Sequence, residues 1–398
     1  MGFTLQPATK DNFVDREKII GEMISTLTDW KIRMGFALIG PRRIGKTSIL
    51  KEVAHRLRDR DDLVVTYFSL WDLIEHGVLE FCNRLTYTIL DAFKGRLSRK
   101  YRVQHLIKVP ASKIFDFLRT IDVRLTVLED VEMALRLRER DKKVDPDLLF
   151  EKVFGLVENL SRDIGVRSVL ILDEFPSIME LRDGQKLGEG VLRKIRTLQE
   201  DFEHTVLCIS GSIRKTMEMA ALSPSSAFYR QFIVKPIGPF NRETTEILIK
   251  RNLGKAISGE ALDHLFTCTA GIPFYVQFMG RALSRFPHES IGAHDVVEVF
   301  DDLLGEEGDL LFTEVFKALS DKERGILSAM AVRGLEAPGE LSKAVNENSN
   351  VVSRYLSYFI EKGILERKEK GKYQFADPVF EQWLIRRYGE VQGEPTNL

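Results

Sequence analysis

A run of glycines, basic residues and a hydroxyl follows an apolar segment near the start of the chain, and these residue types together are suited to binding phosphate. Residues 40–48 read GPRRIGKTS and fit the pattern Gly-x-x-x-x-Gly-Lys-Ser/Thr, between the strand-like run GFALIG and the helix-like run TSILKEVAHRL. Gly40 and Gly45 let the loop wrap around phosphates without a Cβ in the way. The loop amides and the following helix N-terminus then face the β-phosphate. The pattern predicts a site for ATP or ADP with Mg²⁺.

Individual side chains of this loop have distinct predicted roles. Lys46 can reach the β- and γ-phosphate oxygens as a catalytic group, and the hydroxyl of Thr47 is a predicted ligand for Mg²⁺. Arg42 and Arg43 are open between phosphate contacts, interface residues and solvated charge. The predicted nucleotide-binding residues are those of the whole loop: Gly40, Pro41, Arg42, Arg43, Ile44, Gly45, Lys46, Thr47 and Ser48.

A second apolar run ends in two carboxylates. Residues 168–176 read SVLILDEFP, so a buried strand would present Asp173 and Glu174 at its carboxyl end. Asp173 is predicted to hold Mg²⁺, directly or through water, and Glu174 to polarise the attacking water as general base. The alternative is a buried strand that ends in a helix-capping carboxylate. Together with the glycine loop, the acidic pair indicates a P-loop ATPase with a catalytic glutamate, a class that includes AAA+ proteins.

Two further residues are candidates with an open alternative. Ser212 follows the apolar run VLCIS and could contact the γ-phosphate or its water, or could serve ordinary turn chemistry at a strand end. Arg230, in FYRQF, could neutralise charge in the transition state, in its own site or in a neighbour's. A surface or structural arginine is the alternative at this position.

The elements that must position these residues follow from the apolar pattern. Short apolar runs alternate with longer amphipathic stretches up to about residue 235, which is typical of an α/β fold with a parallel sheet covered by helices. The strands are predicted at 35–40, 63–69, 168–173, 205–210 and 232–234. Residues 95–150 are predicted to be an insertion with an antiparallel hairpin over 119–138, although a helical period also fits its second half. Asp145 and Pro146 then begin a helix.

The rest of the chain is predicted to form two smaller domains. Residues 236–312 are expected to be an all-helical lid, with Asn241 as the N-cap of its first helix. Residues 313–388 are expected to form a winged helix-turn-helix from helices over 321–332, 338–345 and 350–362 and a hairpin, and residues 389–398 a flexible tail. The first domain, residues 1–235, is the expected ATPase core.

Composition narrows the class of protein. The chain has 398 residues, a formal net charge of −1 and three widely spaced cysteines. The charge gives no overall attraction to nucleic acid, so a basic surface would have to be local. The cysteines are expected to be reduced residues rather than a disulfide framework or zinc site. No apolar run approaches the ~20 residues that span a bilayer, and the start lacks a signal-peptide pattern. We expect a cytoplasmic protein with no membrane partner.

With these motifs in hand, the chain resembles an archaeal-type ATPase of the STAND clade of AAA+-related NTPases. FVDREKII supplies Phe13, Val14 and Arg16, which the resemblance places near the adenine. GIPFYVQ resembles the Gly-x-Pro motif of the family's lid, in which the proline, here Pro273, faces the nucleotide. The arginine of FYRQF matches a family arginine, and FADPVFEQWL resembles the end of the family's winged helix. Many relatives carry a nuclease-like domain after the winged helix, and we expect this sequence to depart from the family pattern in that respect.

The C-terminal region leaves the output of the protein open. The helix over 350–362 leaves Ser353, Arg354 and Ser357 outside its apolar face as possible groove contacts, and the hairpin carries four basic residues diluted by glutamates. A mixed-charge surface or a protein-contact module is the alternative. Three functions are therefore weighed: an ATP-hydrolysing switch that moves the lid and winged helix, a DNA-binding loader or remodeller, and a non-hydrolysing scaffold. The corresponding partners are ATP, duplex DNA, and another protein or a second copy of the chain.

Overall fold

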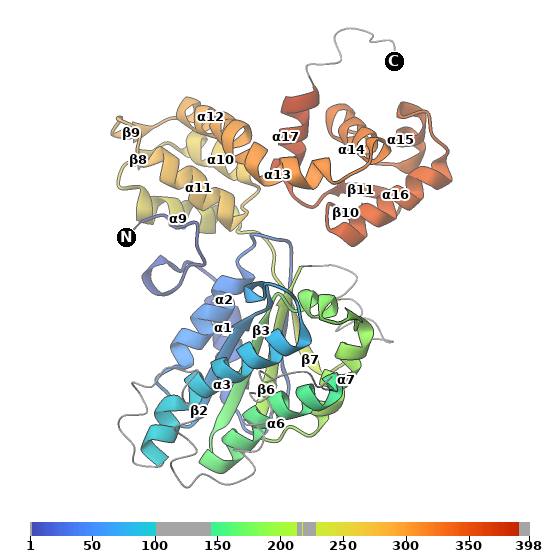
Figure 1. Ribbon diagram of the computed structural model, residues 1–398. Helices are drawn as coiled ribbons and strands as arrows, with labels where there is room; N and C mark the ends of the chain where they lie inside the picture. Colours follow the sequence, from blue (N-terminus) through green and yellow to red (C-terminus); the bar gives the residue numbers. More distant parts are fainter. Residues whose placement is uncertain (1, 101–144, 213–216, 218–227, 390–398) are drawn as a thin grey trace. The chain divides into compact units, whose positions relative to one another are not determined.

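The computed structural model describes residues 2–100, 145–212, 217 and 228–389, and the described chain forms two compact units. We call Arg16–Gly40 with Lys46–Pro236 the core unit. We call the described residues of Met1–Asp15, Pro41–Gly45 and Ile237–Leu398 the helical unit. The chain thus passes from one unit to the other on each side of the loop residues Pro41–Gly45. Both units are drawn in Figure 1.

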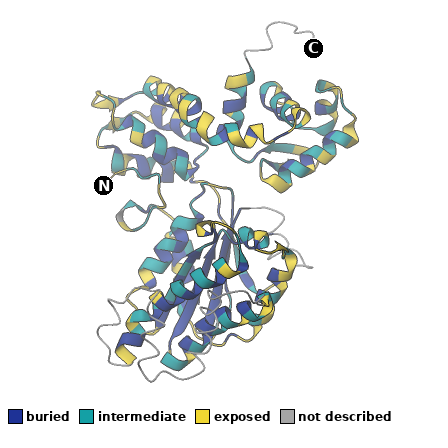
Figure 2. Ribbon diagram, in the orientation of Figure 1, coloured by how far each residue is buried: buried dark blue, intermediate teal, exposed yellow. Residues whose placement is uncertain are grey.

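The core unit is built on a five-stranded parallel sheet of order β2-β3-β6-β1-β7. The strands confirm the five predicted runs: β1 Gly35–Ile39, β2 Leu63–Ser69, β3 Arg167–Asp173, β6 Thr205–Gly211 and β7 Phe232–Pro236. Every residue of β1, β3 and β6 is buried, and Figure 2 shows the strands as the buried centre of the unit. Burial on both faces explains why these strands are apolar without alternation.

Helices cover both faces of this sheet (Figure 1). They are α1 Glu17–Thr28, α2 Lys46–Leu57, α3 Val78–Lys100, α6 Pro146–Ile164 and α7 Glu189–Glu200. Shorter elements are η2 Leu70–Asp72, η4 Phe175–Glu180 and the hairpin of β4 Arg182–Asp183 with β5 Gln185–Lys186. Helix α1 packs on α2, and α3 packs on α6, which packs on α7. A row of aromatic rings joins β2 to α3 and α6, with centroids 5.7 Å apart for Phe68–Phe81 and 5.8 Å for Phe81–Phe150.

The predicted insertion is only partly within the described residues. Residues 95–100 continue α3, and α6 begins as predicted, with the Asp145 carboxylate accepting from the Asp147 amide and Pro146 as its first residue. The hairpin predicted over 119–138 lies outside the described residues. The sequence therefore placed the helix that leaves the insertion correctly, because a capping acid followed by proline is a local signal.

The helical unit begins with η1 Lys10–Asn12 and continues after the core with α9 Arg242–Leu253, α10 Gly259–Thr269, α11 Pro273–Leu283 and α12 Ala293–Asp302. The predicted cap of α9 is confirmed, since Asn241 Oδ1 accepts from the Thr244 amide at 2.7 Å. Two short strands, β8 Ala256–Ile257 and β9 Ser290–Ile291, pair in parallel. A π-helical turn, Leu303–Glu307, joins α12 to α13, Gly308–Lys317. The boundary predicted at 312/313 falls inside α13.

The remaining elements are α14 Asp321–Arg333, α15 Pro338–Ala344, α16 Ser349–Lys362, β10 Leu365–Glu369, β11 Lys372–Phe375 and α17 Pro378–Tyr388. Strands β10 and β11 pair antiparallel. The three helices and the hairpin lie where the sequence predicts them, and their assignment as a winged helix stays a prediction. The buried residues of α16 are Val352, Leu356 and Phe359. No helix in the described part of the chain combines the length and apolarity needed to cross a bilayer.

Candidate nucleotide and magnesium site

The predicted phosphate-binding loop connects β1 to α2. Strand β1 ends at Ile39 and α2 begins at Lys46, so residues 40–45 form the loop. Gly45 has φ +93°, a left-handed conformation that glycine adopts without strain. The Lys46 side chain is buried, and its Nζ donates to the Gly40 carbonyl at 2.9 Å. The ammonium group is thereby held across the loop, where it would meet bound phosphate.

The Asp173 carboxylate accepts hydrogen bonds from four donors, three on α2, β2 and β6 and one from the residue that follows β3. Oδ2 accepts from the Thr47 hydroxyl at 2.8 Å and from the Tyr67 hydroxyl at 2.6 Å. Oδ1 accepts from the Ser210 hydroxyl and from the Glu174 amide, the latter at 3.1 Å. The sheet explains the meeting, because β2, β3 and β6 are neighbours and Ser69 is the register partner of Asp173. The carboxyl ends of parallel strands lie at one edge of a sheet.

The residues at this edge fit a magnesium ion. Asp173 is 2% exposed, and within the described ranges it forms no ion pair with a lysine or arginine. A buried carboxylate without a cation favours one nearby. Because the Thr47 hydroxyl donates its hydrogen to Asp173, the lone pairs of its oxygen remain available to a metal. Hydroxyl and carboxylate oxygens are the ligands that Mg²⁺ prefers.

Tyr67 was not predicted from the sequence. It lies on β2, two residues before Ser69, so the side chains of the two residues share one face of the strand. Burial, with the charge and hydrogen bond of Asp173, raises the pKa of Tyr67 well above its usual value. The phenol therefore stays protonated and acts as a donor. The signal in the sequence is weak, because β2 reads LVVTYFS and Tyr67 is one of three residues in it with a hydroxyl.

Glu174, the predicted general base, has an unusual backbone. Its φ of 53° and ψ of 43° are left-handed, and it precedes the first residue of η4. A non-glycine residue in this region is uncommon and costs on the order of 1 kcal/mol, and such strain concentrates at functional sites. Its amide also lies 3.3 Å from the Ser210 hydroxyl. Glu174 is thus fixed beside the Asp173 carboxylate through its backbone.

Ser210 donates its hydroxyl to Asp173. The contact of Ser212 with the γ-phosphate or its water stays a prediction. Ser212 is buried and follows the end of β6, outside the group of donors on that carboxylate. Residues two positions apart share a face of the sheet only within a strand, and β6 ends at Gly211, so the strand does not place Ser212 on the same face as Ser210. Arg230 is exposed, with its guanidinium 5.2 Å from the Tyr229 ring centroid, and it does not bond to Asp173.

The residues that the resemblance adds lie in different places. Phe13 is buried in the helical unit, where its carbonyl accepts from Arg251 Nη1 at 3.5 Å, and Val14 is half-buried beside it in the sequence. Arg16 begins the core unit as the N-cap of α1, with φ 71°. Pro273 is the first residue of α11. The structure describes their positions, and a role of any of them in nucleotide binding stays a prediction.

Arg43 belongs to the helical unit and is bonded within it. Its Nη1 donates to the Tyr275 hydroxyl at 2.8 Å and to Asp377 Oδ2 at 3.1 Å. The Tyr275 hydroxyl donates to the same Asp377 oxygen at 2.5 Å. The guanidinium also lies 5.4 Å from the ring centroid of Phe274 and 5.5 Å from that of Phe312. We call Arg43, Tyr275 and Asp377 the Arg43 triad.

Burial is the largest influence on the pKa values of Asp377 and Tyr275. It raises the pKa of Asp377, against the hydrogen bond from Tyr275 and the charge of Arg43, and it raises the pKa of Tyr275. Tyr275 and Asp377 were not predicted from the sequence. Each lies next to a helix start that the sequence marks with a proline: Tyr275 follows Pro273 by two residues, and Asp377 precedes Pro378 as the N-cap of α17.

The parallel sheet, the loop between β1 and α2 and the acidic end of β3 define a P-loop NTPase. Residues 13–278, more than half of the chain, match the model of an ATPase domain found predominantly in Archaea, and the chain belongs to that family. Residues 309–384 match a domain of unknown function. The family membership confirms the resemblance to archaeal P-loop ATPases that the sequence motifs indicated.

Two relatives from Methanocaldococcus jannaschii are similar over much of the chain. The uncharacterized ATP-binding protein MJ1659 is 25% identical over 245 residues, which cover 60% of this chain and 63% of that protein, less than two thirds of its length. The uncharacterized ATP-binding protein MJ0074 is 23% identical over 307 residues, or 74% of this chain and 75% of that one.

Solved structures share the fold at low identity. The Walker-type ATPase PABY2304 of Pyrococcus abyssi has a TM-score of 0.69 at 17% identity, covering 96% of this chain and 99% of that one. The Aeropyrum pernix ORC2 protein, in ADPNP–ADP complexes, has a TM-score of 0.51 at 12% identity, covering 96% and 97%. These likenesses confirm the predicted α/β P-loop fold.

Proposed function

We propose that the chain is a Mg²⁺-dependent ATPase that acts as a molecular switch, in which the nucleotide state controls a lid (236–312) and a C-terminal winged helix (313–388). The Arg43 triad carries this proposal. Arg43 is a residue of the phosphate-binding motif, and it is bonded to Tyr275 on α11 and to Asp377, the N-cap of α17. A loop that rearranges when phosphates bind would act on these two helices through one side chain.

The proposed reaction is attack of water on the γ-phosphate. Mg²⁺, when bound, neutralises charge on the phosphate oxygens. Lys46 and the loop amides would stabilise charge on the transferred group, while Thr47 and Asp173 would hold the metal. Glu174 would orient the attacking water and accept its proton. The four donors on Asp173 support this assignment, because they keep the carboxylate in one orientation without a protein cation.

ATP turnover of the purified protein tests the proposal, beside Lys46→Ala and Glu174→Gln. We expect Glu174→Gln to bind ATP with near-normal affinity and to lose on the order of 10²-fold or more in turnover, as loss of a general base does. Lys46→Ala should lose nucleotide affinity as well. Unchanged turnover in Glu174→Gln would show that the general base is wrongly assigned. A wild-type protein that returns ATP intact after long incubation would be a non-hydrolysing scaffold.

Contact with duplex DNA is a second proposal, and three basic residues of the C-terminal region favour it. Arg354, Arg367 and Lys370 are exposed and, within the described ranges, form no ion pair. Two other basic residues of the hairpin form ion pairs: Lys368 with Glu336 at 2.5 Å, and Lys372 with Glu369 at 2.6 Å. The Ser353 and Ser357 hydroxyls bond to carbonyls of their own helix.

This second proposal predicts a weak, salt-dependent interaction. Three phosphate contacts give a slope of about −2.7 for log affinity against log salt. Replacing Arg354, Arg367 and Lys370 together by glutamine should abolish binding in a mobility-shift titration, whereas Lys368→Gln should have little effect. Binding that survives the triple replacement, or that ignores salt, would contradict a DNA-reading role for this surface.

A further inference from the structure

The amino edge of the core sheet carries aromatic and basic side chains that the ATPase site does not use. In the strand order β3-β6-β1-β7, β1 and β7 are neighbours, and Gly35 of β1 is the register partner of Phe232 of β7. The segments that lead into these two strands therefore reach the sheet side by side. We call five residues of these segments the amino-edge row: Trp30, Lys31 and Arg33 before β1, and Tyr229 and Arg230 before β7.

All five side chains of the amino-edge row are open to solvent. Trp30 is 43% exposed and Tyr229 is 38% exposed, and the three basic residues are exposed as well. Within the described ranges these three cations form no ion pair. The nearest acid in the sequence is Asp29, whose carboxylate accepts from a backbone amide of its own turn at 2.9 Å. Asp201 and Glu203 precede β6, on the side of β1 away from β7.

Trp30 is held in place by the residues behind it. The Arg167 guanidinium lies 5.8 Å from the centroid of the Trp30 ring system and also donates to the Ile32 carbonyl. The His204 ring lies nearly perpendicular to the indole, at 89°, with centroids 5.7 Å apart. Arg167 is itself buried. An aromatic ring fixed in this way loses little conformational entropy when a ligand stacks on it.

Tyr229 and Arg230 form the second half of the row, away from the nucleotide site of their own chain. The Arg230 guanidinium lies 5.2 Å from the Tyr229 ring centroid, in a turn where Arg230 has φ 62°. Asp173 ends β3 at the carboxyl edge of the sheet, whereas Arg230 precedes β7 at the amino edge. The five residues of β7 alone rise about 16 Å between these edges. The row therefore faces a ligand other than the γ-phosphate bound by its own chain.

We propose that the amino-edge row binds single-stranded nucleic acid. Nucleobases stack on Trp30 and Tyr229, and backbone phosphates contact Lys31, Arg33 and Arg230. Aromatic side chains accept the face of any nucleobase, and basic residues between them follow the phosphate backbone. A single strand fits better than a duplex, because nucleobases that are stacked within a duplex cannot stack on protein side chains. The site is separate from the surface proposed for duplex DNA and does not depend on ATP hydrolysis.

Binding of labelled oligothymidylate and oligouridylate of ~12 nucleotides to the full chain, measured by fluorescence anisotropy across a salt series, tests the charges of the row. Three phosphate contacts on a single strand predict a slope of about −2.1 for log affinity against log salt. Replacing the three basic residues of the row together by glutamine should weaken binding about 10²-fold at low salt. The same replacement of Arg354, Arg367 and Lys370, matched in charge, should leave single-strand affinity unchanged. The tighter of the two oligonucleotides shows whether DNA or RNA is preferred.

Two aromatic variants test the stacking. Tyr229→Ala should weaken binding about tenfold, as loss of one stacked nucleobase does. Trp71→Ala, at an exposed tryptophan of η2 beyond the carboxyl end of β2, should have little effect. Bound oligonucleotide should also quench tryptophan emission, and this quenching should disappear in Trp30→Phe and persist in Trp71→Phe. Circular dichroism of each variant reports on folding.

Several results would overturn the inference. They are failure of both oligonucleotides to bind at about 100 μM protein in low salt, binding that ignores salt, and equal effects of Tyr229→Ala and Trp71→Ala. Single-strand binding that is lost in the C-terminal replacement and kept in the row replacement would place the ligand on the other surface. An oligoglutamate peptide that competes as well as an unlabelled oligonucleotide would show that the row attracts anions by charge alone.

Discussion

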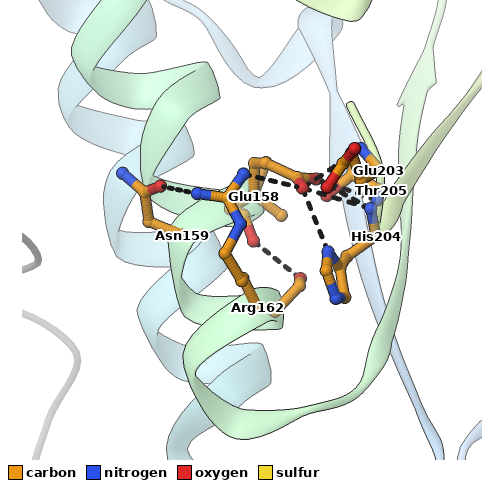
Figure 3. A network of polar contacts seen from close by, with 8 residues as sticks. Glu158, Asn159, Arg162, Glu203, His204 and Thr205 are labelled. Atoms are coloured by element: carbon orange, nitrogen blue, oxygen red, sulfur yellow. Dashed lines mark hydrogen bonds and ion pairs between the residues drawn. The ribbon is translucent and has the colours of Figure 1, made fainter. Parts of the chain in front are cut away.

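The clearest energetic prediction concerns Glu158, a buried carboxylate on α6 at the amino end of β6 (Figure 3). Its oxygens accept from the amides of Glu203, His204 and Thr205 at 3.0–3.2 Å. His204 Nδ1 lies 3.3 Å from Oε1. One side chain thus satisfies three consecutive amides as the chain enters the strand that carries Ser210 at its other end.

The loss of unfolding free energy expected for Glu158→Gln follows from these hydrogen bonds. Glutamine keeps one acceptor oxygen, and from the Oε2 position this oxygen can still accept from the His204 and Thr205 amides. The NH₂ group then faces the Glu203 amide, and because Glu203 is exposed, water can replace that bond. The main loss is the charge of the acceptor, at ~1 kcal/mol for each of the two remaining bonds, which gives a loss of about 2 kcal/mol. Glu151→Gln, on the same helix, removes only an exposed pair with Lys194 and should cost less than about 1 kcal/mol.

Urea unfolding, with amide exchange of the peptide 203–211 as a local probe, measures both changes. We expect Glu158→Gln to lose stability and to lose exchange protection at the start of β6, and Glu151→Gln to do neither. Equal effects of the two substitutions would refute the reasoning, because they would mean that burial and the three amides add nothing to an ordinary surface carboxylate.

Two further predictions concern the lid and the pH dependence of the core unit. Gly271→Ala should lower the free energy of unfolding by about 3 kcal/mol or more, because φ is +67° and an added Cβ would lie 2.1 Å from the Phe240 carbonyl oxygen. Gly254→Ala, at φ +70° with open space around the added Cβ, should lower it by about 1 kcal/mol. Thermal unfolding of both variants measures the difference. Hydrogen bonds from Arg56 lower the pKa of Glu17 below 4.5, so the pair contributes stability above that pH and loses it as the pH falls through the folded-state pKa. Because the pair is largely exposed, the difference between wild type and Glu17→Gln should stay under about 1 kcal/mol near neutral pH and vanish in acid, and a difference that grows in acid would contradict the assignment.

The sequence predicted what local pattern determines. The glycine loop, the strand that ends at Asp173 and the caps Asp145 and Asn241 each depend on residues within a few positions of one another, and the structure has those elements there. The bond between Thr47 and Asp173 joins two motifs that parallel strands bring to one edge, so it too could be expected.

The sequence could not predict contacts that depend on strand order or on distant segments. Tyr67 and Ser210 meet Asp173 because β2 and β6 flank β3, an order that apolar periodicity does not encode. Arg43 lies 232 positions from Tyr275 and 334 from Asp377, so no spacing rule connects them.

We propose that nucleotide state reaches the helical unit through Arg43, and amide exchange at the start of α17 tests this proposal most directly. The Val379 and Phe380 amides bond to Asp377 Oδ1 at 3.1 and 3.4 Å, so their exchange reports on the triad. The measurement compares Glu174→Gln without nucleotide, with Mg²⁺–ADP and with Mg²⁺–ATP, and repeats the series with Arg43→Lys added. We predict different protection with ATP and ADP, lost in the Arg43→Lys background. Identical protection in all nucleotide states, or a difference that survives Arg43→Lys, would contradict the claim.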